Sequence, residues 1–194
     1  MSNEAVNASP PNTAVPASFS MSRTLLDAAL FAAEKHRHQR RKDAAASPYI
    51  NHPLTVAHIL AEEGGIEDPV VLIAALLHDT LEDTDTTAKE LEAKFGPEIT
   101  GVVLEVTDDT SLPAKERKRL QVEHAPGASP KAKLVKLADK IANLRDLSHA
   151  PPTGWSKSRK QDYFDWARAV VAGLRGVNRR LEAAFDVDFS QRPE

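Results

Sequence analysis

I-A-A-L-L-H-D-T-L-E-D-T-D-T, residues 73–86, is an apolar run that ends abruptly in acidic residues. Side chains three and four positions apart share one face of a helix, so Glu82 is expected over His78 and Asp79, and Asp83 over Asp79. Carboxylates at this density repel one another unless a cation lies among them. Because the C-terminus of a helix also favours positive charge, this stretch predicts a divalent metal site at the end of a buried helix.

The composition limits what else the chain can be. Its 194 residues suit one domain with a substantial core. The net charge of −3 argues against a surface that binds nucleic acid in general. The chain has no cysteine, which excludes disulfides, thiolate zinc sites, iron–sulfur clusters and cysteine nucleophiles, so a metal must be held by His, Asp or Glu. No apolar stretch approaches the roughly 20 residues of a membrane span.

The first 20 residues differ from the rest of the chain. Residues 1–20 contain no Lys or Arg and include three prolines among Ser, Ala and Asn. A secretory signal needs a basic start and an apolar centre, and neither is present. We expect residues 1–20 to be a disordered tail, residues 21–190 to form the domain, and the protein to be cytoplasmic.

The remaining sequence predicts an all-α fold, because apolar residues recur with helical periodicity and no convincing alternating strand is present. Asp68-Pro69, Thr87-x-x-Glu90 and Ser129-Pro130 are start signals for helices. The expected helices cover residues 22–38, 53–63, 69–79, 87–96, 97–106, 114–124, 130–148, 156–174 and 176–185.

Three further segments add polar groups to the His78-Asp79 pair. Y-I-N-H-P-L at 49–54 places His52 at the start of a helix. K-L-V-K-L-A-D-K-I-A-N-L-R-D-L at 133–147 places Asp139 and Asn143 four positions apart on one face of a largely buried helix. K-H-R-H-Q-R-R-K at 35–42 is a dense cationic run beside the first of these segments.

In these motifs the chain resembles the HD phosphohydrolase superfamily. More narrowly, it resembles the hydrolase domain of RelA/SpoT proteins and the small alarmone hydrolases, a group that includes the metazoan SpoT homologue. The resemblance covers residues 22–185 and rests on Y-I-N-H-P, A-A-L-L-H-D-T-x-E-D-T, E-R-K-R-L-Q and K-L-A-D-K-x-x-N-L-R-D-L in this order. It implies a single HD-domain helical bundle of about eight to ten helices. Nothing in the sequence matches the synthetase, TGS or ACT regions of the long RelA/SpoT proteins, so only hydrolysis is implied.

The resemblance assigns roles to particular residues. As metal ligands it implies His52, His78, Asp79 and Asp139. As the pair that positions and activates the attacking water it implies Glu82 and Asp83. As residues that bind substrate it implies Arg41, Lys42, Asn143, Tyr163 and, in the E-R-K-R-L-Q segment, Arg117.

The implied reaction is metal-dependent hydrolysis of the alarmone (p)ppGpp, which releases pyrophosphate from the 3′ position and gives GDP or GTP. The expected partner is therefore a small nucleotide, with no nucleic acid and no membrane, and the oligomeric state is not readable from the sequence. Imidazole ligands suit Zn²⁺, Fe²⁺ or Mn²⁺, and carboxylate ligands suit Mn²⁺ or Mg²⁺. Mn²⁺ satisfies both and is the ion that the family implies.

Three alternatives remain open. A phosphatase that removes the 2′-phosphate of NADPH would use the same metal site and the same kind of ribose phosphate. A non-catalytic nucleotide sensor on a degenerate HD fold is disfavoured, because all six positions that bind metal or activate water are intact. A helical interaction module would need the charges to be merely solvated.

Overall fold

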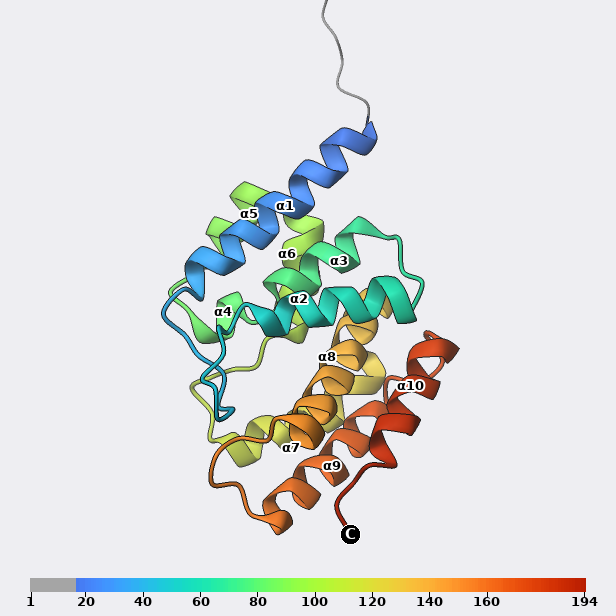
Figure 1. Ribbon diagram of the computed structural model, residues 1–194. Coiled ribbons are helices and arrows are strands. Elements are labelled where there is room, and N and C mark those ends of the chain that lie inside the picture. The colour runs from blue at the N-terminus through green and yellow to red at the C-terminus, as the bar shows by residue number, and fades with distance from the viewer. Residues whose placement is uncertain (1–16) are drawn as a thin grey trace, which may run out of the picture.

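Residues 17–194 are described by a computed structural model, which folds them into a bundle of helices (Figure 1). No strand occurs within residues 17–194, where an isolated bridge pairs Arg40 with Pro48. The all-α prediction is thus confirmed. The helices are α1 (Ala17–Lys35), α2 (Asn51–His58), its π-helical extension η1 (Ile59–Glu63), α3 (Pro69–Leu77), α4 (Thr80–Asp83), α5 (Ala88–Phe95), α6 (Pro97–Val106), α7 (Ala114–His124), the 3₁₀ turn η2 (Ala125–Gly127), α8 (Pro130–His149), α9 (Lys157–Ala172) and α10 (Arg179–Phe189).

The predicted start signals are used as helix caps. The side chains of Asp68, Thr87 and Ser129 each accept a hydrogen bond from a backbone N–H in the first turn of α3, α5 and α8. Such caps satisfy N–H groups that have no partner inside the helix and contribute about 1 kcal/mol each. Proline follows the cap in α3 and α8, where its missing N–H costs no hydrogen bond.

Helix α8 is the central element of the bundle. It packs against α2, α3 and α6, and also against α9, α10 and η1 (Figure 1). Leu137, Ile141 and Leu144 are fully buried along it, and each such side chain contributes about 1.5–3 kcal/mol when it is removed from water. This burial fixes the rotation of α8 and thereby the direction in which Asp139 and Asn143 project.

The chain turns sharply at His78-Asp79. The sequence predicts one helix over 69–79, whereas α3 ends at Leu77 and α4 begins a new turn at Thr80. The Thr80 hydroxyl donates to the Leu77 carbonyl at 2.6 Å, which satisfies an acceptor freed by the end of α3. The backbone N–H of Asp83 still bonds the carbonyl of Asp79, at 2.9 Å. Glu82 and Asp83 therefore follow His78 on a separate short turn rather than on a continuation of α3.

The predicted tail lies mostly outside the described residues. Residues 1–16 fall outside them, and α1 begins at Ala17, four residues before the expected start of the domain at 21. Within the described part of the chain, no helix combines the length and apolar character that a membrane crossing requires.

Candidate metal centre and adjoining cavity

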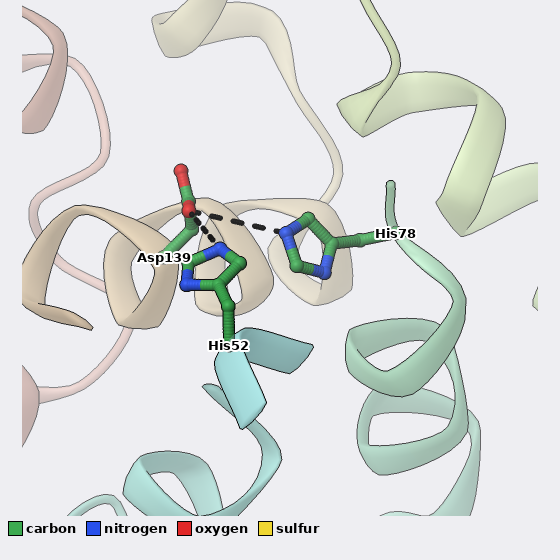
Figure 2. Close-up of side chains that lie close together, drawn as sticks. All are labelled: His52, His78 and Asp139. Carbon is green, nitrogen blue, oxygen red and sulfur yellow. Dashed lines mark ion pairs between the residues drawn. The ribbon is translucent and has the colours of Figure 1, made fainter. Parts of the chain in front are cut away.

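Three helices bring the predicted metal ligands together. His52 comes from the start of α2, His78 from the residue after α3, and Asp139 from the middle of α8, and their side chains point toward one another (Figure 2). One ligand atom from each lies within 4.8 Å of the others. The His52 Nε2 atom is 3.1 Å from Asp139 Oδ1, and the His78 Nε2 atom is 3.9 Å from the same oxygen. Asp79 Oδ2 lies 3.1 Å from His78 Nε2 and 3.7 Å from His52 Nε2.

Neighbouring groups orient these side chains. The His78 Nδ1 atom is 2.7 Å from the Ala75 carbonyl oxygen, so in the neutral imidazole Nδ1 carries the proton and Nε2 offers the lone pair that a metal ion would bind. The Tyr49 hydroxyl donates to Asp79 Oδ2 at 2.6 Å. Asn143 Nδ2 donates to Asp139 Oδ1 at 2.6 Å. The ligand atoms are thus held before any ion arrives.

The cluster carries an excess of negative charge. Burial opposes the charged form of His78, but the Asp79 and Asp139 carboxylates outweigh it and raise the pKa of His78 to about 9. Burial also opposes ionisation of the two carboxyls. The His78 imidazole nevertheless lowers the pKa of Asp79, and Lys140, with Nζ 2.9 Å from Asp139 Oδ2, lowers that of Asp139. Without a metal, the site therefore retains a proton where a cation would otherwise lie.

The residues fit a divalent metal ion. Two imidazole nitrogens and an Asp139 oxygen converge, the Asp79 carboxylate lies beside both imidazoles, and His52 and His78 are only 4% and 6% exposed. The buried His78 Nε2 atom has no hydrogen-bond partner among the described residues, although Asp79 lies near it. A buried polar atom without a partner is costly, and a metal ion would satisfy it. The mixed nitrogen and oxygen donors suit a borderline divalent ion.

Glu82 and Asp83 border this cluster. Together with the four proposed ligands they line a cavity of about 190 Å³. Burial and the neighbouring Asp108 charge raise the pKa of Glu82, while burial and the Asp79 charge raise that of Asp83. A carboxylate with a raised pKa is a stronger base, which is the property needed to accept a proton from water.

A second, larger cavity of about 560 Å³ adjoins the first. Arg41, Lys42, Asn143 and Tyr163, which the sequence predicts as substrate-binding residues, all line it. Arg41 pairs with Asp146 and lies 5.5 Å above the centre of the Tyr49 ring. Its charged lining consists of the cations Arg40, Arg41 and Lys42 and the carboxylates Asp43, Asp83 and Asp146, and we call it the basic cavity for its three cations. Five residues line both cavities: Arg41, Tyr49, His52, Asp83 and Asn143.

Arg117 lies elsewhere. It is not among the described residues that line either cavity, and its Nη1 atom donates to Glu82 Oε1 at 2.7 Å. Of the neighbouring basic residues in the same segment, Arg119 pairs with Glu116 and Glu123, and Lys118 Nζ lies 4.8 Å from the centre of the Trp166 ring.

Sequence reasoning missed two residues at the site. Tyr49 stands inside a motif that was recognised, but nothing in the motif indicates that its hydroxyl would contact Asp79. Trp155 lies in a loop rich in proline, where an aromatic side chain is the available signal, and its ring is 6.0 Å from that of Tyr163.

An all-α bundle that buries a convergent His-Asp cluster beside a basic cavity defines a class of metal-dependent phosphate-ester hydrolases. A family model described as an HD domain matches residues 28–165. The Homo sapiens guanosine-3′,5′-bis(diphosphate) 3′-pyrophosphohydrolase MESH1 is 63% identical over 168 residues, which cover 87% of this chain and 94% of that protein. The MESH1 of Drosophila melanogaster is 54% identical over 162 residues, or 84% of this chain and 90% of that protein. The chain belongs to the HD-domain family and, within it, to the MESH1 group.

A solved structure agrees with this assignment. It is described as a metazoan ortholog of SpoT that hydrolyzes ppGpp and plays a role in starvation responses. It superposes with a TM-score of 0.85 at 49% identity, over 95% of this chain and 98% of that one. The resemblance predicted from the motifs is therefore confirmed at the level of both sequence and fold.

Proposed function

We propose that this protein is a metal-dependent hydrolase that removes pyrophosphate from the 3′ position of (p)ppGpp and leaves GDP or GTP. The observation that carries the proposal is the junction of the two cavities. An acidic cluster that fits a divalent ion opens directly into a basic cavity large enough for a nucleotide. The relatives named for this reaction support the same substrate.

In this reaction the oxygen of a water molecule bonds to the phosphorus that is attached to the 3′ oxygen. The bond between that phosphorus and the 3′ oxygen breaks, and the 3′ oxygen takes up a proton. His52, His78, Asp79 and Asp139 would hold the ion, which supplies Lewis acidity to the phosphate and lowers the pKa of water. Glu82 would accept the proton of the attacking water, because its carboxylate borders the cluster cavity and its pKa is raised. Asp83 lines both cavities and would position that water.

The basic cavity would bind the anionic part of the substrate. Arg41 and Lys42 line it and would neutralise phosphate charge through charge-assisted hydrogen bonds. Asn143 and Tyr163 line the same cavity and would contact the remainder of the nucleotide. Mn²⁺ is the proposed ion, because it accepts imidazole and carboxylate ligands equally well.

The test is turnover by the purified protein after removal of metal with a chelator. Mn²⁺, Mg²⁺, Zn²⁺ and Fe²⁺ are added back one at a time, and ppGpp and NADPH are supplied in parallel. We expect GDP and pyrophosphate from ppGpp, with the highest rate in Mn²⁺. Absence of both products with every metal would overturn the proposal, and faster release of phosphate from NADPH would reassign the site to that substrate.

A further inference from the structure

Glu82, the proposed proton acceptor, is held at both carboxylate oxygens by groups from outside its own helix. Arg117 on α7 donates from Nη1 to Oε1 at 2.7 Å. The backbone N–H of Asp108, in the loop before α7, donates to Oε2 at 3.3 Å. The two paired side chains are partly buried, with 22% of Glu82 and 29% of Arg117 exposed. Such a pair is less screened by solvent than a fully exposed one.

Arg117 and the proposed metal ligands line different cavities. Glu82 lines the cluster cavity, whereas Arg117 lines a different cavity of about 220 Å³. Asp108, Gln121 and Lys136 border both of these cavities. The contact between Arg117 and Glu82 therefore joins the walls of the two cavities.

Helix α7 is attached to the bundle by polar contacts and by Val122, which is partly buried against the core. None of the described α7 side chains is buried, and the helix packs on α9 and η2. The Trp166 indole N–H of α9 donates to the Lys118 carbonyl at 3.0 Å, and Gln121 donates to Asp108 Oδ2 at 2.5 Å. These bonds hold α7 beside the loop that contains Asp108, here called the 108 loop. Arg117 therefore reaches Glu82 from a defined position.

We infer that Arg117 is a positioning residue for the hydrolysis, which acts on the reaction through Glu82 rather than by binding substrate. This inference rests on the proposed function. A glutamate has three flexible side-chain torsions, and Asp79, Asp83 and Asp108 all repel its charge. The Arg117 contact holds the carboxylate against that repulsion and leaves a lone pair on each oxygen for the water proton.

The first test separates kcat from KM in three single variants. Arg117→Ala is expected to lower kcat by about 10- to 100-fold, because a small displacement of a catalytic group has an effect of that order. Its KM should stay within about twofold, since no substrate contact is lost. Arg117→Lys should recover part of kcat, because the present contact uses one donor. The matched control is Arg119→Ala on the same helix, which removes only the surface pairs with Glu116 and Glu123 and should leave both constants unchanged.

The second test measures binding without turnover. In Glu82→Gln protein loaded with Mn²⁺, the Kd of ppGpp is compared with and without Arg117→Ala by calorimetry. A Kd that changes by less than about twofold supports a positioning role. A tenfold weaker Kd, or a tenfold higher KM with kcat unchanged in the single variant, would show that Arg117 binds substrate and would overturn the inference.

The third test needs neither substrate nor metal, and so remains informative if ppGpp is not turned over. The melting temperature of the chelator-treated protein is compared for Arg117→Ala, Glu82→Ala and the double variant. Arg117→Ala should lower the melting temperature less when residue 82 is already alanine, because the partner is gone. Equal shifts in both backgrounds would show that the two side chains are not coupled, and would reject the inference independently of the proposed reaction.

Discussion

The two adjoining cavities differ in charge and in access to water. The smaller cavity, about 190 Å³, is bordered by buried imidazoles and by five carboxylates, Asp79, Glu82, Asp83, Asp108 and Asp139. The larger cavity, about 560 Å³, balances the carboxylates Asp43, Asp83 and Asp146 with the cations Arg40, Arg41 and Lys42, and adds the aromatic rings of Trp155 and Tyr163. The smaller cavity suits a cation and the larger cavity suits an anion. The metal ion and the phosphate would therefore bind in different parts of one continuous cavity.

Burial makes the two regions unequal in strength. The His52 and His78 side chains are almost inaccessible, whereas the paired Arg41 and Asp146 side chains are 20% and 45% exposed. Electrostatic interactions weaken as solvent gains access. Changes to the acidic cavity should therefore abolish activity, and changes to the basic cavity should reduce it by smaller factors.

The largest effect is expected for Asp79→Ala. This change removes an oxygen 3.1 Å from His78 Nε2 and leaves the Asp139 carboxylate, 3.9 Å away, as the nearest one to that nitrogen. Loss of a metal ligand should lower turnover of ppGpp by about 10⁴-fold or more, since the metal supplies much of the charge stabilisation. Elemental analysis and product assays check this together. Asp85→Ala is the control, because Asp85 is an exposed acid of the same segment that pairs with Lys35; equal losses in both variants would contradict a specific metal site at Asp79.

The next effect is a pH dependence confined to the acidic cavity. In the metal-free protein the pKa of His78 is raised from 6.5 to about 9, so below pH 9 the imidazole holds a proton that an ion must displace. Metal affinity should therefore fall as pH falls, by about 100-fold between about pH 8.5 and about pH 6.5.

Calorimetry in two buffers of different ionisation enthalpy measures this competition. It should detect release of about one proton for each ion bound near neutral pH. An affinity that is constant over the range, or binding without proton release, would mean that His78 is already neutral in the metal-free protein.

A smaller effect is expected for Arg41→Ala in the basic cavity. Loss of a charge-assisted hydrogen bond to phosphate should raise KM by about tenfold. This effect is near the lower limit for such bonds, because Arg41 is already paired with Asp146. The metal dissociation constant should not change. The control is Arg37→Ala, from the same basic run, which removes exposed contacts with Glu34 and His38. A fall in kcat or in metal content, with KM unchanged, would place Arg41 in the acidic cavity's function instead.

The fold was predictable wherever local signals decide it. The predicted spans 97–106 and 114–124 coincide with α6 and α7, because proline and a polar loop delimit them. The last helix was predicted over 176–185 but begins at Arg179, because the Asn178 side chain caps it by accepting from the N–H groups of Arg180 and Leu181. Helix α4 was not predicted as a separate element, since the periodicity of 73–86 does not reveal that Thr80 bonds back to Leu77.

The site was predictable as a set of residues but not as a set of contacts. Motif resemblance named His52, His78 and Asp139, which lie on three helices, and the fold brings them together. No local pattern predicts that Arg117 crosses to Glu82, because that contact spans 35 residues and depends on how α7 lies against the 108 loop. Sequence periodicity fixes which face of a helix a side chain occupies, whereas packing between helices decides what that side chain meets.

The smallest predicted effect on turnover is that of Tyr49→Phe, and the same change at Tyr163, the other tyrosine of the chain, serves as its counterpart. Tyr49→Phe removes the hydroxyl that donates to Asp79 Oδ2 but keeps the ring, which lies 4.8 Å from that of His36. Loss of a hydrogen bond that orients a ligand should raise the metal dissociation constant by about tenfold, with kcat restored at saturating metal. Tyr163→Phe is the counterpart, and should leave metal affinity unchanged because Tyr163 lines the larger cavity. If Tyr49→Phe instead lowers kcat at saturating metal, the hydroxyl acts on the attacking water beside Asp83. Tyr49, which lines both cavities, would then contribute to the reaction as well as to metal binding.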